Sequence, residues 1–498
     1  MSKVITNNGN FSGGYFVLNK VAKENTFVSG QGFYVTCKTD KGLLNSILKL
    51  IGEADKYIKI CSFIIDNKQI VESLKSKLKE GKLSVFILTA VDDKKIKSDM
   101  LDEDETAELS KSRHFEFIDA LVKSGAHVRA SSNAHAKFVI KDGTEALLMS
   151  ANLTEPSLNN NEKGKAPNDE SGIVIDKQDE VKTLERIFDS IFLYGTEFRR
   201  FINLSDNIQL IGKNENEIRK SDFPESNTNV LWSYDRFHHS IYENLNSVIG
   251  SASKTVNLST YSIVELNNLP ELINSFKIFL NEKKGKAKIF CRAMNHRPDH
   301  IAACKQLSEL GIEIFGNMFN HSKGISVDSR VGIIFTANID GKHGLKDGFE
   351  VGYKIDSSHT SFESFNSFLN YQIQSAPFVY KLSPNKTEVF DFYKLWYQDK
   401  EIKVASIFPE TFEIKFRSNA FFANEFEEMI SNYPIFFTPL SRPDTKEIQL
   451  KINGKAYLLD TLNESTFVVK QQLQFRDIVK GEEYMLFYNK INLTGYES

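Results

Sequence analysis

The chain of 498 residues contains few cysteines, and they do not form a metal-binding or disulfide pattern. Cys37, Cys61, Cys291 and Cys304 are scattered, and no two of them have C-x-x-C spacing. Disulfide frameworks and structural zinc sites usually show such short spacings. We therefore expect a protein of a reducing compartment that carries no structural zinc.

Long apolar runs are also missing. Residues 1–16 (MSKVITNNGNFSGGYF) have no apolar stretch behind their single lysine, and no segment approaches 18 uninterrupted apolar residues. A secretory signal needs the first feature and a membrane-spanning helix needs the second. The sequence therefore predicts a cytoplasmic protein with no integral membrane association.

The sequence has no excess of charge of either sign. Lys and Arg number 62 and Asp and Glu number 65, which gives a formal net charge of −3. A protein that coats nucleic acid over a large surface is usually strongly basic. Any polyanion that this chain binds is therefore expected to lie in a local groove.

One polar motif is present twice. The first copy consists of His135, Lys137, Asp142, Ser150 and Asn152, and the second consists of His321, Lys323, Asp328, Thr336 and Asn338. The His precedes the Asn by 17 residues in both copies (152 − 135 and 338 − 321), and the copies are 186 residues apart (321 − 135). Flanking apolar and glycine positions repeat at the same offset, so the chain contains an internal duplication.

Each copy lies within an α/β pattern. Buried strands are predicted at 57–65 and 83–89 with a helix at 68–79 between them, and the second copy repeats this order. The long crossovers predict largely parallel strands. We expect a first repeat with an N-terminal extension at 1–204, a linker at 205–228, a second repeat at 229–378 and an accessory domain at 379–498.

The last of these regions has a different pattern. Residues 447–452 alternate between polar and apolar, and Asn453-Gly454 is typical of a type I′ hairpin turn. Residues 401–404 and 413–416 resemble strands, and residues 420–431 resemble a helix. The pattern predicts a small, mostly β domain, and it contains no catalytic motif.

The repeated residue types suit phosphodiester chemistry. On a strand, the His and Lys of His-x-Lys point to the same face, and so do the Ser or Thr and Asn that follow. Two such faces supply two imidazoles, two ammonium groups and two carboxamides around one cavity. Lys and Asn bind the non-bridging oxygens, while one His attacks and the other protonates the leaving oxygen. The residues alone do not say which His attacks.

Both copies resemble the HxK(x)4D(x)6GSxN signature of the phospholipase D superfamily. The resemblance implies an α/β fold, a pseudo-twofold duplicated phospholipase D-like α/β/α/β/α sandwich with one active site at its seam. It implies a two-step mechanism through a phosphohistidine, with no metal and no cofactor. By this resemblance His135 is the nucleophile and His321 the general acid, and Glu170 and Glu350 orient the histidines. Asp142, Asp328, Ser150 and Thr336 then have structural parts.

The chain departs from the signature at the glycine, where Met149 and Phe335 stand. The copies also differ between Asn and Glu, where the first copy has a longer loop that includes residues 159–165. The bulkier side chains of Met149 and Phe335 either reshape the pocket or face the core. We expect the loop to border the substrate entrance and substrate choice to depend on these departures.

Three functions compete. The first is a nuclease that cleaves DNA or RNA, and the resemblance extends this to bacterial defence systems with an ATP-driven translocase or helicase partner. The second is a soluble phospholipase D or transphosphatidylase, which requires an apolar lip beside the site. The third is a catalytically silent scaffold that binds nucleic acid, against which the intact motifs argue. The sequence leaves the oligomeric state open.

Overall fold

The computed structural model describes residues 14–30, 32–81, 83–90, 107–131, 133–159, 167–202, 208–211, 218–224, 228–235, 238–295, 297–384 and 388, and seven strands between 402 and 492. Two ten-stranded sheets, one in each half of the core, carry the duplication. In order across the first sheet the strands are β11 (Ile208–Ile211), β10 (Phe198–Ile202), β6 (His127–Ala130), β5 (Ser84–Thr89), β4 (Tyr57–Cys61), β7 (Phe138–Lys141), β8 (Glu145–Met149), β9 (Glu170–Ile175), β2 (Phe33–Cys37) and β3 (Asp40–Lys41).

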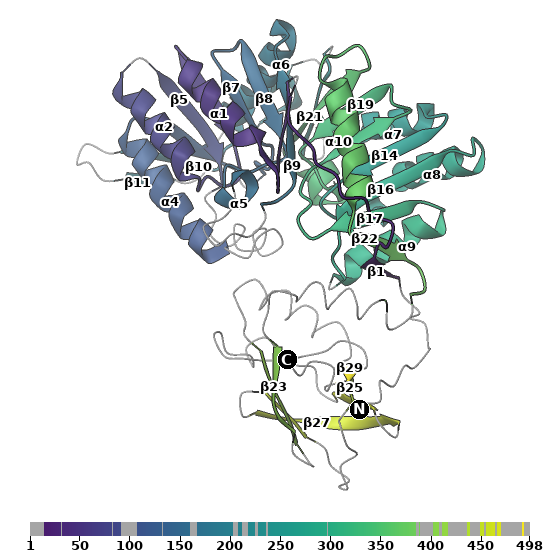
Figure 1. The fold of residues 1–498 in the computed structure, drawn as a ribbon. Helices are drawn as coiled ribbons and strands as arrows, with labels where there is room; N and C mark the ends of the chain where they lie inside the picture. The colour runs from purple at the N-terminus through teal and green to yellow at the C-terminus, as the bar shows by residue number, and fades with distance from the viewer. Residues whose placement is uncertain are drawn as a thin grey trace.

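The second sheet has the same arrangement. In order its strands are β1 (Tyr15–Leu18), β22 (Phe378–Lys381), β17 (Glu313–Asn317), β16 (Lys286–Arg292), β14 (Thr255–Ser259), β18 (Gly324–Val327), β19 (Val331–Phe335), β21 (Glu350–Asp356), β12 (Val230–Tyr234) and β13 (His238–His239). Two short strands, β15 (Ile263–Val264) and β20 (Ile339–Asp340), pair separately. Figure 1 shows the two halves side by side, with β9 and β21 near the seam.

The sheets are mixed, so the expectation of largely parallel strands is wrong. In the first sheet β4, β5 and β6 run parallel, and β14, β16 and β17 do so in the second. The other paired strands of both sheets run antiparallel. Helical crossovers impose parallel pairing only where they join neighbouring strands, whereas the motif strands are joined by tight turns.

Helices complete a five-layer α/β/α/β/α sandwich. The outer helices are α1 (Gly42–Glu53), α2 (Lys68–Lys79) and α4 (Ala107–Lys123) in the first half, and α7 (Ser240–Ser251), α8 (Pro270–Asn281) and α9 (Pro298–Glu309) in the second. The central layer contains α6 (Gln178–Tyr194) and α10 (Phe362–Ser375), and short helices are α5 (Glu155–Leu158), η1 (Lys220–Asp222), η2 (Leu266–Asn268) and η3 (His343–Asp347). The three main apolar clusters match these layers, because side chains of α6 and α10 pack in one cluster with residues of both sheets.

Strand β4 illustrates how the sequence builds these layers. Ile58 and Ile60 pack in the outer cluster of the first half, and Cys61 packs in the central cluster. Lys59 also faces the centre, where its Nζ donates to Oδ1 of Asp189 on α6 at 2.7 Å. The alternation of a strand thus directs successive residues to opposite faces. The polar side chain of Lys59 is tolerated in this buried strand because Asp189 pairs with it.

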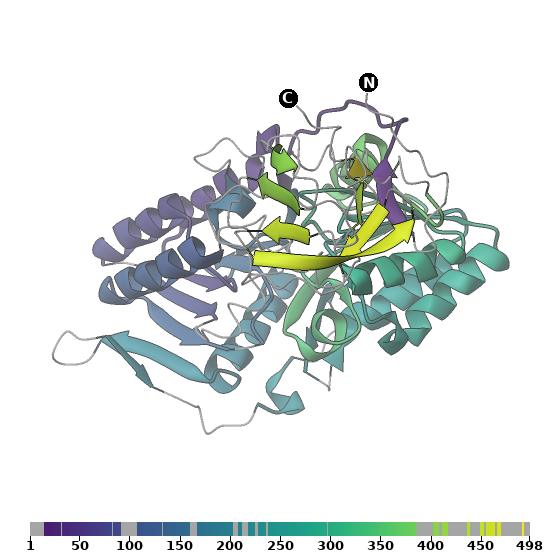
Figure 2. The same cartoon turned by 90° about the horizontal axis from the view of Figure 1, so that it is seen from below.

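The strands do not follow the expected domain boundaries everywhere. Strand β1, expected with the first repeat, pairs antiparallel with β22 at the edge of the second sheet. Strand β11 lies within the expected linker and pairs with β10 of the first sheet. Strand β22 extends past residue 378. In Figure 1 the N-terminal trace crosses from β1 to the first half, and Figure 2 shows the β10–β11 hairpin projecting from its edge.

The C-terminal region contains a seven-stranded sheet. Its strands are β23 (Ile402–Ile407), β24 (Thr411–Phe416), β26 (Gln449–Ile452), β27 (Lys455–Asn463), β28 (Thr466–Val469), β25 (Phe436–Thr438) and β29 (Ile491–Asn492). The antiparallel register brings Ile452 opposite Lys455, which confirms the hairpin predicted around Asn453-Gly454. The helix expected at 420–431 lies outside the described residues. In the part of the chain that the structure describes, no helix is both long and apolar enough to span a membrane.

Candidate active site

The His-x-Lys segments of both motifs lie just before strands, not within them as expected. His135 and Lys137 precede β7, and His321 and Lys323 precede β18. The backbone pairing nevertheless continues through them, because Met149 N–H donates to Lys137 O at 3.0 Å. Each His therefore lies just before the first residue of its strand, where one segment of the other half approaches. Isolated bridges, Ala134 with Phe349 and Asp169 with Asn320, join the halves at these points.

Each motif histidine contacts the glutamate of the opposite half. Nδ1 of His135 lies 2.6 Å from Oε1 of Glu350, and Nδ1 of His321 lies 2.7 Å from Oε1 of Glu170. The glutamates are 1% and 0% exposed, while the side chains of His135 and His321 are 21% and 2% exposed. Because a carboxylate can only accept, each Nδ1 carries the proton and each Nε2 presents its lone pair. Either imidazole is therefore arranged to attack, or to carry a proton and deliver it.

The remaining oxygen of each glutamate is held by the motif hydroxyl. Ser150 Oγ donates to Oε2 of Glu170, and Thr336 Oγ1 donates to Oε2 of Glu350. Each hydroxyl also accepts a backbone N–H, from Ser171 at 3.0 Å in the first case. Both carboxylates thus have two directed partners, which fixes the plane in which each meets its imidazole. This explains why the motif position takes Ser or Thr.

The electrostatics around Glu350 favour its ionised form. Burial raises the pKa of Glu350, but the charges of His135 and Lys137 and the hydrogen bonds from His135 and Thr336 outweigh it, so the pKa is lowered below its ordinary value. An ionised glutamate stabilises an imidazolium and keeps the histidine in one tautomer. The pair is therefore suited to proton transfer.

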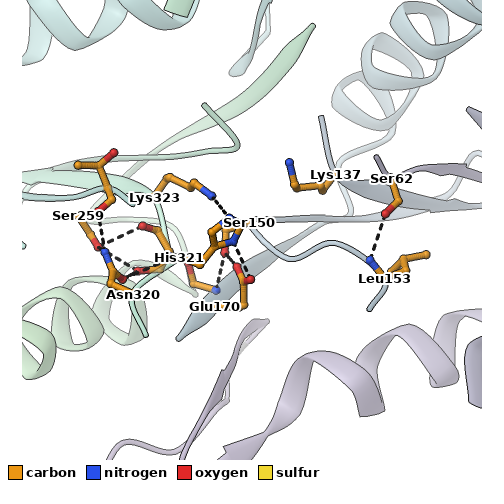
Figure 3. A network of polar contacts seen from close by, with 12 residues as sticks. Ser62, Lys137, Ser150, Leu153, Glu170, Ser259, Asn320, His321 and Lys323 are labelled. Atoms are coloured by element: carbon orange, nitrogen blue, oxygen red, sulfur yellow. Dashed lines mark hydrogen bonds and ion pairs between the residues drawn. The ribbon is translucent and has the colours of Figure 1, made fainter. Parts of the chain in front are cut away.

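Two buried lysines bring positive charge to the seam. Nζ of Lys137 donates to His135 O at 2.6 Å, and Nζ of Lys323 lies 3.2 Å from Nε2 of His321. Their residues are 0% and 1% exposed. Figure 3 shows Lys323 reaching toward His321, with Lys137 extending from the other half toward the same group of residues. An ammonium group next to the reactive Nε2 is placed to bind an anionic oxygen there.

The motif asparagines lie beside the same segments. Asn152 is buried and Asn338 is half-buried. The residue after each asparagine is hydrogen-bonded to a hydroxyl just past the end of β4 or β14. Leu153 N–H donates to Ser62 Oγ at 3.1 Å, and Ile339 N–H donates to Thr260 Oγ1 at 3.2 Å. Sequence reasoning missed these two hydroxyls. Ser62 and Thr260 are 198 residues apart (260 − 62), which is also the spacing between the strands that precede the two motifs, and this shared spacing marks them as equivalent.

The motif aspartates lie away from the histidines, at the turns that end β7 and β18. Both have φ of 53°. Asp142 accepts the backbone N–H groups of residues 55–57 at 2.8–2.9 Å, and Asp328 accepts those of residues 253–255 at 2.7–2.8 Å. Burial raises both pKa values, but these donors outweigh it and lower them. Each aspartate thus anchors the turn to the start of the neighbouring strand.

The two departures from the motif glycine do not face the site. Met149 packs in the outer cluster of the first half and Phe335 in that of the second, and both are fully buried. Of the two alternatives, that they reshape the pocket or that they face the core, the second is confirmed. Strand alternation explains this, because Ser150 and Thr336, one residue later, face the centre. Most of the longer loop, residues 160–166, lies outside the described residues.

One cluster has a composition that suits a metal. Cys291, His300 and Cys304 are buried together, with the two sulfurs 3.8 and 3.6 Å from Nε2 of His300. However, Nδ1 of His300 accepts the N–H of Ile263 at 3.1 Å, and Nε2 lies 3.1 Å from Arg292 O. Nε2 must then carry the proton, so it offers no lone pair to a metal.

The first half supports this interpretation. His114, 186 residues earlier, makes the same contacts: Nδ1 accepts Ile65 N–H at 3.0 Å, and Nε2 lies 2.9 Å from Ala90 O. Each histidine therefore links two segments of its own half through its two ring nitrogens, residues 65 and 90 in the first half and residues 263 and 292 in the second. His114 and His300 have the same spacing of 186 residues as the two motifs (300 − 114), which marks them as an equivalent pair in the sequence.

One family model matches most of the first half of the chain. Residues 47–192 match the family described as cardiolipin synthase, phospholipase D-like domain. No curated protein sequence matches the chain.

Several solved structures resemble the fold. Polyphosphate kinase from Porphyromonas gingivalis matches with 12% identity and a TM-score of 0.43, over 68% of this chain and only 50% of its own. Phosphatidylserine synthase from Haemophilus influenzae Rd KW20 matches with 12% identity and a TM-score of 0.47, over 76% and 90%. The phospholipase D family member Nuc from Salmonella typhimurium matches with 19% identity and a TM-score of 0.26, over 30% and 96%. All three scores are below 0.5, and no inference about substrate follows from them.

Proposed function

Because the chain belongs to the phospholipase D superfamily of phosphodiesterases, we propose that it is a metal-independent nuclease that cleaves DNA or RNA through a phosphohistidine. The observation that carries the proposal is the crossed pair of contacts, His135 with Glu350 and His321 with Glu170. One scissile phosphate bound between the two imidazoles is reached by both. A nucleophile and an acid on opposite sides are what in-line displacement requires.

The proposed mechanism assigns each group a step. Nε2 of His135 attacks phosphorus, and the bond to the leaving oxygen breaks as His321, in its imidazolium form, donates its Nε2 proton. Lys137, Lys323 and the motif asparagines bind the non-bridging oxygens. Neutral His321 then takes a proton from water, whose oxygen attacks phosphorus and releases His135. Glu350 and Glu170 stabilise the positive charge that each imidazole carries in turn.

The surface supports nucleic acid over phospholipid. A lipid-cleaving enzyme needs a contiguous apolar surface for the acyl chains. Among the described residues, the exposed large hydrophobic side chains are Val21, Val28, Leu193, Tyr194 and Phe319. They come from three parts of the sequence, and of these five residues only Phe319 is close in sequence to a motif histidine. The buried lysines at the seam match the phosphodiester that both substrate classes contain, so the preference rests on the scattered apolar side chains.

The biological setting is proposed from the superfamily resemblance alone. We propose a cytoplasmic role in a bacterial defence system, together with an ATP-driven translocase or helicase. The β-rich region is the natural candidate for partner recognition, because it carries no catalytic motif. Purification of the tagged chain from its own host would retain such a partner, and its absence would contradict this part of the proposal.

Activity tests separate the functions. Purified protein in EDTA is incubated with labelled single- and double-stranded DNA, RNA and phosphatidylcholine vesicles. Cleavage of nucleic acid supports the proposal, and hydrolysis of lipid alone overturns it. His135→Ala and His321→Ala should each reduce turnover to background, since the halves share one site. Acid-labile, base-stable phosphate trapped on His135 identifies the nucleophile, and trapping on His321 would reverse the assignment.

A further inference from the structure

Four buried polar side chains are hydrogen-bonded to one another around the segment that carries His321. They come from the last residue of β14, from the two residues that flank His321 and from α10, and they are Ser259, Asn320, Ser322 and Gln372. Each is at most 1% exposed. We call these four residues the His321 network, and Figure 3 labels Ser259 and Asn320 beside His321.

The hydrogen bonds of the network fix the backbone next to His321. Oδ1 of Asn320 accepts Ser322 Oγ–H at 2.9 Å and Ser322 N–H at 3.3 Å. Nε2 of Gln372 donates to Asn320 Oδ1 at 3.1 Å and to Ser322 Oγ at 2.8 Å. Oγ of Ser259 lies 2.9 Å from Oγ of Ser322. The residues on both sides of His321 are thus tied to β14 and to α10.

The equivalent positions of the first half are apolar. The motifs are 186 residues apart (321 − 135), the strands before them 198 (255 − 57), and the apolar residues of α6 and α10 181 (369 − 188). These offsets give the counterparts of the network as Cys61, Ala134, Ala136 and Ile191. All four are 0% exposed and pack in the central apolar cluster. The same fold therefore accepts an apolar core at these positions.

Stability does not explain why the second half is polar here. Burial removes water from polar groups, and their hydrogen bonds to one another at best offset this loss. Among the described residues, Oε1 of Gln372 has no hydrogen-bond partner, which adds to the cost. Since the first half shows an apolar alternative, the network calls for an explanation in the chemistry of the site. What a buried polar network adds is rigidity in one arrangement.

The two histidines have different tasks in the proposed mechanism. His135 approaches phosphorus and forms a bond to it, whereas His321 exchanges a proton at one place in both steps, first with the leaving oxygen and then with water. A misplacement of about 1 Å can slow a reaction about 100-fold. The side chain of His321 is 2% exposed and that of His135 is 21% exposed, so His321 is the more closely enclosed of the two.

We propose that the His321 network is a set of positioning residues that hold His321 where it gives and takes the proton. This rests on the proposed function, in which His321 is the acid and then the base. The network fixes the backbone of residues 320–322, while Glu170 fixes the imidazole at Nδ1. Backbone and ring together then keep Nε2 in one place. The network therefore supports the two proton transfers and not the attack by His135.

Two leaving groups with different needs for a proton test the proposal. Bis(4-nitrophenyl) phosphate releases 4-nitrophenolate without protonation, whereas an oligonucleotide releases a sugar alkoxide that needs a proton. In Asn320→Ala, oligonucleotide cleavage should slow about 10- to 100-fold. Steady-state turnover of the ester should slow similarly, because water must still lose a proton to His321. The first-turnover burst of nitrophenolate should stay within about twofold of wild type. An equal loss in the burst, or no loss in any of the three rates, overturns the proposal.

The first half supplies a variant that separates positioning from stability. Ser259→Cys/Asn320→Ala/Ser322→Ala/Gln372→Ile replaces the network by its apolar counterparts. It should melt no lower than wild type, because it removes the unpaired oxygen and repeats a packing that the first half already uses. Its kinetic defect should match that of Asn320→Ala. A lower Tm with equal losses in the burst and in oligonucleotide cleavage would show that the network serves folding alone, and would overturn the proposal.

A matched control removes a polar contact between the same two elements. Ser326 Oγ on β18 donates to Asn366 Oδ1 on α10 at 2.7 Å. Neither residue belongs to the network, so Ser326→Ala should leave the burst and oligonucleotide cleavage unchanged. Loss of either rate in this control to the extent seen in Asn320→Ala would show that any change between β18 and α10 has the same effect, and would overturn the proposal.

Failure of the network differs from failure of the function on which it rests. If the wild type cleaves both substrates and the variants lose all rates equally, the network alone is rejected. If the wild type cleaves the ester but no nucleic acid, the nuclease is rejected, and the ratio of burst to steady-state turnover still decides on the network. A wild type that cleaves neither rejects the proposed function and the role of the network together.

Discussion

Exchange of either buried glutamate for glutamine tests the crossed arrangement of the His–Glu pairs. Glu350→Gln keeps an oxygen that can accept from Nδ1 of His135 but removes the charge that stabilises the imidazolium. The contact is 2.6 Å long and Glu350 is 1% exposed, so water does not replace it. Loss of a buried charge-assisted hydrogen bond costs about 1.5–3 kcal/mol. The chemical step should therefore slow about 10- to 150-fold.

The choice of leaving group separates the two pairs. A 4-nitrophenolate leaves without a proton, whereas a sugar alkoxide needs one. The two substrates compared are bis(4-nitrophenyl) phosphate and an oligonucleotide. If His135 attacks and His321 donates the proton, Glu350→Gln slows both the first-turnover burst of nitrophenolate and the cleavage of the oligonucleotide. Glu170→Gln, which affects His321, slows the oligonucleotide but leaves the burst within about twofold of wild type. Stopped-flow absorbance measures the burst before the second step limits turnover.

A control and a trapping experiment make this test decisive. Glu185→Gln removes a glutamate that contacts Tyr57 and Lys59 away from the motif histidines, and it should leave both rates unchanged. The nucleophile is identified by the residue that retains labelled phosphate. If the label is on His135 but Glu170→Gln is the variant that slows the burst, the crossed pairing is refuted.

Three further predictions concern stability. Asp328→Asn should lower the free energy of unfolding by about 0.5–2 kcal/mol at pH 7 in urea, the size of a capping interaction. The pKa of Asp328 is lowered in the folded state, so its contribution to stability is present above the ordinary Asp pKa and is lost as pH falls through the folded-state pKa. The difference in unfolding free energy between wild type and Asp328→Asn should therefore vanish in acid, and a difference that stays constant with pH would contradict this. Met149→Ala should cost about 2–5 kcal/mol by opening the outer core, with the preference among DNA, RNA and lipid unchanged, and altered preference would show that Met149 does reach the substrate. His300→Gln and His114→Gln should lower Tm by similar amounts, and EDTA should not change Tm of the wild type, whereas a fall in Tm with EDTA would reveal a metal in the cysteine cluster.

The resemblance to the phospholipase D superfamily, carried by the duplicated motif, implied the five-layer fold and the members of the site. It also implied a carboxylate partner for each histidine, and the positions of Glu170 and Glu350 just before matching strands made them the candidates. Their crossing was not predictable from spacing, since it depends on how the ends of β9 and β21 meet across the seam. Residues 159–165 lengthen one copy, yet both glutamates arrive at equivalent places.

Other differences have local physical causes. The pattern predicted parallel strands because helices follow the first strands of each half, but turns such as the one at Asp142 reverse the chain afterwards. Met149 and Phe335 looked like pocket residues because the motif has glycine there, whereas alternation turns both into the outer cores.

The pairing of β1 with β22 has a topological consequence. Tyr15 lies opposite Lys381, so the chain enters and leaves the duplicated core on hydrogen-bonded neighbouring strands. The core is therefore nearly a closed loop of polypeptide, in which β1, which precedes the first half in sequence, completes the sheet of the second half. A circular permutant that joins these two ends by a short linker and opens between β11 and β12 would preserve the paired strands of both sheets. Conversely, a cut between the halves leaves the first fragment carrying the edge strand of the second, so the two fragments should reassociate through β1.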